Sequence, residues 1–456
     1  MTRKRLLIPT LLILISLAIT ACGAPAAAPQ APADTQAPAA AEAPAATEAP
    51  AEAAPVTLTY LVDDSQATQD TANALADAYM AMHPNVTINI ELRPGGTEGD
   101  NIIKTRLATD DMPDIFWYNS GSLLQALQPT ETLVDLANEP FIASIQEAFL
   151  PTVSQNGGVF GVPSGTAMGG GILYNKKIYA DLGLSAPTTW AEFEANNAKI
   201  KEAGITPVIQ TYGDTWTSQL FVLADFYNVA QAVPSFADDY TANAAKYATT
   251  PAAMAGFSYL AEGFNDGWYQ KDFATDKFDQ GLSQLANGEG AHYPMLTFAL
   301  SAIAANFPDQ INDIGFFAQP GADAAKNGAT IWMPAGTYIP KTTTGEQLAV
   351  AKDFLAFITS TAGVDAVNAK QQPAGPFMVK GSVLPDTVVP AVKDLAVYVD
   401  SGNNGPALEF VSPVKGPSLE QITVAVGSGQ MTPEEAAAAY DQDVEKQAKQ
   451  LGLPGW

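Results

Sequence analysis

The segment from residue 158 to residue 193 reads GVFGVPSGTAMGGGILYNKKIYADLGLSAPTTWAEF, and it combines a strand signal with a helix-start signal. Its middle, Ile172–Tyr174, is a short apolar run that predicts a buried strand. Near its end, Thr189 and Glu192 have the spacing of a capping box, in which each side chain bonds the backbone amide of the other. The segment therefore predicts a strand followed by a helix that begins after Thr189.

The chain before this segment alternates between strand-like and helix-like patterns. Residues 56–62 and 86–92 alternate apolar or branched residues with polar ones, which predicts two strands. Between them, apolar residues recur at helical spacing over 72–80. Such a strand, helix, strand unit favours a parallel sheet. A helix over 101–108 and a short buried strand over 113–118 continue the alternation.

The chain after the segment carries further helix signals. Residues 348–358 form an amphipathic pattern, and residues 433–451 predict a long alanine-rich helix that begins with a second capping box at Thr432. The body after residue 55 is also longer than a single hydrophobic core usually supports. We therefore expect two lobes.

The N-terminus has the pattern of an export signal. Basic residues at 3–5 precede an apolar stretch over 6–19, and small residues lead to Cys22. This pattern resembles a bacterial lipobox, which predicts a signal peptide over 1–21 and lipidation of Cys22. The alternative is an uncleaved anchor helix, although the apolar stretch is short for a membrane span. Residues 22–55 are rich in alanine and proline and predict a disordered stalk.

Composition excludes several classes of function. The formal net charge of −26 argues against nucleic-acid binding and fits an extracellular protein with a neutral or cationic ligand. Cys22 is the only cysteine, which rules out a disulfide framework and a cysteine-based zinc cluster. Only two histidines occur, so no histidine metal site or nucleophile triad is supported. We expect no metal, no cofactor and no catalytic residue.

The opening segment resembles the extracellular solute-binding proteins of ABC importers, specifically the carbohydrate-binding group similar to maltose-binding protein. The matching stretches follow one another in order and spacing: Gly158–Pro163, Ile172–Tyr179, Leu182–Leu184 and Pro187–Phe193. Weaker matches occur at Pro113–Ile115, Gly288–Ala291 and Asp313–Gly315. The resemblance covers nearly the whole body of the chain.

The resemblance implies a bilobal α/β fold, with two discontinuous lobes joined by a hinge and the ligand cleft between them. By analogy, lobe 1 spans 56–164 and 318–348, and lobe 2 spans 165–317 and 349–456. The implied function is that of a monomeric, lipid-anchored receptor on the extracellular face of the cytoplasmic membrane. It would bind a sugar or oligosaccharide and deliver it to an ABC permease, without a catalytic step.

Sugars have flat apolar faces and a rim of hydroxyl groups, so aromatic rings and short polar side chains are the candidate contacts. Trp216 lies in a polar loop broken by glycine and is a candidate for stacking. Residues that follow a strand of an open α/β sheet often reach a ligand. Because neighbouring strand residues point in opposite directions, only one of Trp117 and Tyr118 is expected in the cleft. We favour Tyr118, followed by Asn119.

Other candidates come from comparison with the family pattern. The family places a glycine, a small polar residue and a ligand-contacting tryptophan where this chain has Leu296, Thr297 and Phe298. We therefore expect Thr297 to be a polar ligand contact. Phe298 stands where the family has the tryptophan and is a candidate for the stacking role. Trp332 lies near the later crossing between lobes and is also a candidate.

Two polar candidates complete the expected site. The family often places a polar ligand contact at the end of the first strand, where this chain has Asp63 and Asp64. We favour Asp64 and also include Thr166. Trp190, in the first capping box, is expected in the core instead.

Two other classes of function stay open on the sequence alone. The same fold could bind a non-sugar solute such as a peptide or a polyamine. An anchored carbohydrate-active enzyme would use a pair of carboxylates, and a chain with 48 acidic residues contains many chance pairs. No single pair of carboxylates stands out in the sequence as a catalytic pair.

Overall fold

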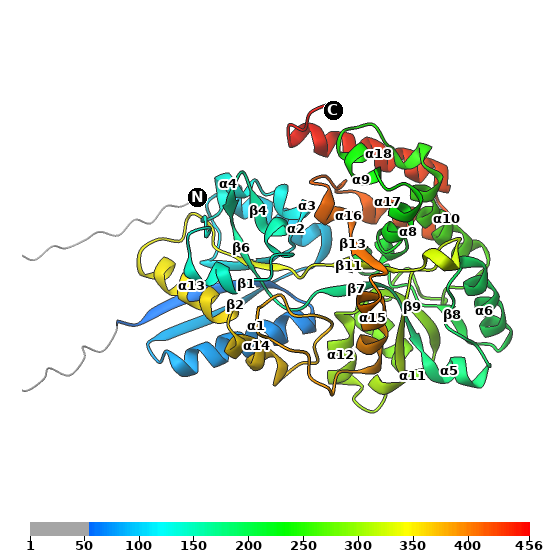
Figure 1. Ribbon diagram of the computed structural model, residues 1–456, viewed down its shortest axis with the longest axis horizontal. Helices are drawn as coiled ribbons and strands as arrows, with labels where there is room; N and C mark the ends of the chain where they lie inside the picture. The colour runs from blue at the N-terminus through cyan, green and yellow to red at the C-terminus, as the bar shows by residue number, and fades with distance from the viewer. Residues whose placement is uncertain (1–53) are drawn as a thin grey trace, which may run out of the picture. The chain divides into compact units, whose positions relative to one another are not determined.

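The computed structural model describes residues 54–456 of the chain (Figure 1). The expected signal peptide, Cys22 and nearly all of the expected stalk lie outside the described residues. Within the described part, no helix is both long and apolar enough to span a membrane.

The first lobe is built on a five-stranded sheet with the order β2-β1-β3-β12-β6. Its strands are β1 (Val56–Asp63), β2 (Val86–Arg93), β3 (Ile115–Tyr118), β6 (Gly161–Pro163) and β12 (Gly336–Tyr338). β1 pairs in parallel with both β2 and β3, whereas β12 is antiparallel to β3 and β6. The expected parallel strand, helix, strand unit is therefore confirmed.

Four longer helices belong to this lobe: α1 (Gln66–Met82), α2 (Gly96–Ala108), α13 (Gly345–Ile358) and α14 (Thr361–Asn368). α1 packs against β1 and β2, α13 packs against β1, and α14 packs against α1 and α13 (Figure 1). Their apolar side chains share one core with the strands, in which Tyr79 of α1 meets Phe354 of α13 at a ring distance of 5.1 Å. Smaller elements complete the lobe: α3 (Ser122–Gln125), α4 (Pro129–Thr132), η1 (Pro140–Ser144), η2 (Leu150–Val153), β4 (Ser154–Gln155) and β5 (Gly158–Val159).

The second lobe is built on a six-stranded sheet centred on β7 (Met168–Asn175), which contains the expected strand Ile172–Tyr174. The order is β13-β11-β7-β9-β8, and β10 also pairs with β7. The other strands are β8 (Thr206–Val208), β9 (Gly290–Leu296), β10 (Ile314–Ala318), β11 (Ala329–Trp332) and β13 (Asn404–Pro406). β9, β10 and β11 each run antiparallel to β7.

Helices surround this second sheet (Figure 1). The α-helices are α5 (Lys176–Asp181), α6 (Trp190–Glu202), α7 (Leu220–Leu223), α8 (Phe226–Ala232), α9 (Phe236–Thr241), α10 (Pro251–Asn265), α11 (Phe278–Asn287), α12 (Ala299–Asn306), α15 (Pro390–Asp400), α16 (Leu408–Val411), α17 (Leu419–Gly427) and α18 (Pro433–Gln450). The 3₁₀ turns are η3 (Thr215–Gln219), η4 (Tyr247–Thr249), η5 (Ile311–Asp313) and η6 (Ala324–Lys326). Both predicted capping boxes, at Thr189 and Thr432, are present, and Trp190 is buried as expected.

The core contacts correct two of the expected lobe boundaries. Residues 329–332 form β11 of the second sheet, although 318–348 was assigned to lobe 1. Residues 349–358 lie in α13 and contribute Ala351 and Leu355 to the first core, although they were assigned to lobe 2. The reason is packing: the apolar face of α13 has its partners on β1, which the local pattern of residues 348–358 does not reveal.

The chain crosses between the lobes three times. It leaves the first sheet after Pro163 and enters β7 at Met168, and it returns between Trp332 of β11 and Gly336 of β12. The third crossing lies between Met378, in the first core, and Val388, in a core of the second lobe. All three connections lie at the same junction, where a hinge would act.

Candidate ligand-binding site

A cavity of about 880 Å³ lies between the two lobes. The first lobe lines it with the β1–α1 junction, the start of α2 and the end of β3. The second lobe contributes residues of η3, the end of β9 and the end of β11. The volume lies within the range of about 300–1,000 Å³ that is typical of small-molecule sites.

Asp63 ends β1 and faces this cavity at the carboxyl edge of the parallel strands. Its side chain is oriented by Ser65, whose backbone amide and hydroxyl both donate to Oδ1, at 2.9 and 2.6 Å. The hydroxyl of Thr68 also lies close enough to the carboxyl group to lower its pKa. Ser65 also caps α1. This turn thus orients the Asp63 carboxylate at the cavity.

Burial changes the electrostatics of Asp63. The side chain is 8% exposed, and this desolvation raises the pKa of the carboxyl group, while the hydrogen bonds from Ser65 and the charge of Arg93 oppose the increase. Asp64, the expected contact, also lines the cavity but is exposed to solvent. Of the two aspartates, Asp63 has the more fixed geometry.

The tryptophan of β3, and not the tyrosine beside it, reaches the cavity. Trp117 is half-buried and lines the cavity, whereas Tyr118 is fully buried and does not. Burial and the negative charge of Asp100 raise the pKa of the Tyr118 phenol. Of this pair, the structure thus places Trp117 at the cavity and not Tyr118, the residue that the sequence favoured. The alternation along β3 is clear from sequence, but the face that meets the cleft depends on the neighbouring strands.

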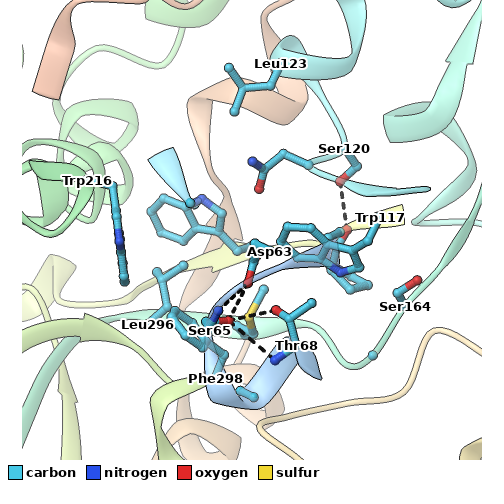
Figure 2. Close-up of a pocket in the computed structure, with 18 of the residues that line it drawn as sticks. Asp63, Ser65, Thr68, Trp117, Ser120, Leu123, Ser164, Trp216, Leu296 and Phe298 are labelled. Carbon is cyan, nitrogen blue, oxygen red and sulfur yellow. Dashed lines mark hydrogen bonds between the residues drawn. The ribbon is translucent and has the colours of Figure 1, made fainter. Parts of the chain in front are cut away.

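Aromatic rings from the second lobe form a cluster on the opposite wall. Trp216, in η3, lies 5.2 Å from the ring of Phe278 and 6.0 Å from that of Phe298. Phe278 and Phe298 stack at 5.5 Å with an angle of 24° between their planes. Figure 2 shows Trp216 and Trp117 on opposite sides of the pocket, with Asp63 between them. Rings from two lobes can therefore contact the same solute.

Of the expected ligand contacts Thr297 and Trp332, only Trp332 lines the cavity. Thr297 is fully buried and does not line the cavity. Its hydroxyl accepts from the amide of Gly169 at 3.0 Å and donates to the carbonyl of Ala374 at 2.8 Å. Thr297 thus joins β7 to the returning chain and lies away from the cavity, unlike the position expected for a ligand contact. Trp332 lines the cavity, although the side chain is 6% exposed.

The structure brings six of the eight expected contacts to the cavity: Asp64, Asn119, Thr166, Trp216, Phe298 and Trp332. It adds hydroxyl groups that the sequence did not single out, among them Ser65, Thr68, Ser120 and Ser164 (Figure 2). Ser120 directly follows Asn119 and could have been included for that reason. Ser164 and Phe410 are placed at the cavity by long-range contacts and have no local signal.

Acidic side chains are more numerous than basic ones around the cavity. The acidic residues are Asp63, Asp64, Glu98, Asp100, Asp214, Asp279, Glu409 and Glu420, and the basic ones are Arg93, Lys104, Lys277 and Lys415. Lys415 and Glu409 pair at 3.6 Å. Within the described residues, no group of three or more His, Cys, Asp or Glu has the arrangement of a metal site. The cavity thus offers aromatic faces, hydroxyls and carboxylates.

Two discontinuous α/β lobes with a cavity between them define a bilobal solute-binding protein. A family model described as "Bacterial extracellular solute-binding protein" matches residues 63–365, and the chain belongs to this family. Members of this family are binding proteins and not enzymes.

The chain is similar to two characterised sugar-binding proteins. It is 24% identical over 282 residues to the multiple sugar-binding protein of Streptococcus mutans serotype c, a match that covers 60% of this chain and 64% of that protein. It is 24% identical over 344 residues to the melibiose/raffinose/stachyose-binding protein MelE of Bacillus subtilis, covering 73% and 77%. Among solved structures, a chitin oligosaccharide binding protein superposes with a TM-score of 0.73 at 22% identity, covering 87% of this chain and 99% of that chain. The superposition with the chitin oligosaccharide binding protein shows that this chain has the same fold.

Proposed function

We propose that this chain is the lipid-anchored extracellular receptor of a carbohydrate importer. It binds a sugar or oligosaccharide between its lobes and delivers it, chemically unchanged, to an ABC permease. The observation that carries this proposal is the cavity itself, in which Trp117 and the Trp216–Phe298 cluster approach from different lobes.

Each part of the cavity suits one part of a sugar. Aromatic faces cover the apolar faces of pyranose rings, and carboxylates and hydroxyls bond the ring hydroxyls. We assign ring contacts to Trp117, Trp216, Phe298 and Trp332, and hydroxyl contacts to Asp63, Asp64, Asn119 and Thr166. A solute that contacts both lobes stabilises the closed arrangement, because the open one loses half of those contacts.

The anchoring and the partners are proposed from the N-terminal sequence and the family. Lipidation of Cys22 would attach two acyl chains, which is enough for stable membrane association. The alanine- and proline-rich residues 22–55 would then separate the binding domain from the membrane surface. We propose that the receptor acts as a monomer and that the permease and ATPase subunits are separate chains.

The proposal is tested by the melting temperature of the protein with a panel of sugars. We expect at least one of melibiose, raffinose, stachyose, maltose and chitin oligosaccharides to raise the melting temperature, because a ligand that binds only the folded state stabilises it. Chromatography of the sugar after incubation should show no cleavage. The proposal fails if no sugar in the panel raises the melting temperature.

The excess of acidic residues around the cavity favours one alternative, a polyamine ligand. A polyamine would pair with the carboxylates of Asp63 and Asp279 and would need fewer aromatic contacts. Spermidine therefore belongs in the same panel. A melting shift with spermidine and with no sugar would replace the proposed ligand class.

A further inference from the structure

The first turn of α2 in the first lobe lies opposite a carboxylate of the second lobe. A Cβ atom added at Gly96 would lie 3.3 and 3.4 Å from the two carboxylate oxygens of Glu420, and 3.6 Å from the Cβ of Trp216. Gly96 has a φ of +63°, a conformation that L residues with a side chain rarely adopt. Glycine at this position therefore allows the two lobes to approach closely beside the cavity.

Glu420 is firmly held by its own lobe. It lies in α17 and is 7% exposed. The hydroxyl of Thr215 donates to its Oε2 at 2.6 Å, and Thr215 is the neighbour of Trp216 in η3. Within residues 54–456, no lysine, arginine or histidine forms an ion pair with it. Its negative charge is thus directed at the opposite lobe.

The start of α2 is a favourable place for this charge. The helix follows Gly95, whose backbone is extended and which has no side chain to cap the first amides. Unbonded amides at a helix N-terminus carry a partial positive charge, which a nearby carboxylate stabilises. Glu98 is the acidic residue of the first turn, and its side chain is exposed.

Asp100 of α2 and Lys415 of the second lobe line the same cavity. Burial raises the pKa of Asp100, and a hydrogen bond from Tyr118 and the positive charges of Lys104, Arg93 and Lys415 oppose that increase. Lys415 is 14% exposed and pairs with Glu409. Within the segment from Glu409 to Glu420, Lys415 is thus paired with Glu409, and Glu420 is the residue that lies against the start of α2.

We propose that Glu420 is an interlobe positioning residue: held by Thr215, it faces the N-terminus of α2 when the lobes come together and so fixes Trp216 at the cavity wall. Its contribution to ligand affinity rests on the proposed function. Its effect on the contact between the lobes does not need a ligand.

The test is hydrogen exchange of the full-length protein, followed by mass spectrometry without any sugar. Glu420→Gln keeps the shape of the side chain and its bond to Thr215 but removes the charge. We expect amides in residues 96–101 to exchange about two- to fivefold faster in this variant, the factor that corresponds to the usual strength of a charge at a helix end. Thr215→Val should have a smaller effect in the same direction, because it frees the carboxylate without neutralising it.

Glu346→Gln is the matched control, since Glu346 is an exposed acidic residue in the first turn of another helix, α13. It should leave exchange in residues 96–101 unchanged. Wild-type exchange of residues 96–101 in Glu420→Gln would overturn the proposal, and so would faster exchange spread evenly over both lobes.

A binding measurement separates this proposal from the proposed function. The dissociation constant of raffinose should rise in Glu420→Gln by a factor similar to the change in exchange. If raffinose does not bind the wild-type protein but exchange in residues 96–101 still changes, the positioning role stands and raffinose is excluded as a ligand.

Discussion

Trp332 packs directly against the backbone of Gly170 in the adjacent strand. A Cβ atom at Gly170 would lie 2.2 Å from Cζ3 of the Trp332 ring, a distance that no side chain can occupy without displacing the indole. β11, which ends at Trp332, pairs with β7 at this point. The absence of a side chain at Gly170 therefore sets the position of an aromatic wall of the cavity.

Gly170→Ala is expected to destabilise the protein and to weaken ligand binding. The added methyl group must displace the Trp332 ring, and overpacking of this kind costs about 1–3 kcal/mol. Urea unfolding measures the loss. Gly405→Ala, in β13 of the same sheet, is the control, because the nearest atom to its new Cβ would be at an ordinary 3.4 Å. Equal stabilities for the two variants would contradict this account of Trp332.

Trp216→Ala is expected to weaken sugar binding by about 1–3 kcal/mol, if the ring covers a sugar face as proposed. Isothermal titration calorimetry measures the change. Trp456→Ala is a suitable control, because Trp456 lies at the C-terminus, where Lys246 is 4.1 Å from its ring centroid, and does not line the cavity. An unchanged affinity in Trp216→Ala would remove this residue from the site.

The two aromatic residues of β3 should respond differently to substitution. Trp117→Ala should reduce affinity, because its ring lines the cavity. Tyr118→Phe should leave affinity within about twofold of wild type, since Tyr118 is fully buried and does not line the cavity. The same titrations measure both. The opposite ranking would restore the original expectation that Tyr118 contacts the ligand.

Asp63→Asn should separate stability from binding. The pKa of Asp63 is raised in the folded state, so the folded protein favours the protonated carboxyl group. The folded protein therefore becomes less stable relative to the unfolded chain as the pH rises through the folded pKa. The neutral amide avoids that cost. We therefore expect Asp63→Asn to melt at a higher temperature than wild type at pH 7.5, with a difference that narrows as the pH falls towards about 4, the ordinary range for aspartate.

The same substitution should weaken sugar binding at pH 7.5, because a carboxylate accepts stronger hydrogen bonds from sugar hydroxyls than an amide does. Asp272→Asn, at an exposed position, should change neither property. A variant that melts below wild type at pH 7.5 would show that the ionised carboxyl group stabilises the fold.

Local patterns in the sequence predicted most individual elements correctly. The first two strands, the helix between them and both capping boxes depend on neighbouring residues, and each appears where expected. The assignment of elements to lobes was less reliable. α13 was recognised as a helix, but its placement on β1 depends on Phe354 and Leu355 finding partners nearly 300 residues earlier in the chain.

The candidate site also contains residues that the sequence could select and residues whose position depends on tertiary packing. Trp216 could be selected from its residue type and loop context, and Phe298 and Asp64 from the resemblance to the family pattern, and all three line the cavity. Thr297 has an equally suitable type, but the packing of β9 against β7 turns it towards Gly169 and Ala374. Residue type alone does not distinguish these cases.

The sequence by itself determined the class of protein, the order of strands and helices and the chemistry available for binding, because periodicity, capping and an ordered family motif are local properties. Only the tertiary structure decided that Trp117 rather than Tyr118 faces the cavity, that Thr297 bonds Gly169 and Ala374, and that Glu420 meets the start of α2. These relationships join segments that are distant in the chain, or they depend on which face of a strand is buried. They arise from packing across the sheets and between the lobes, which no local pattern encodes.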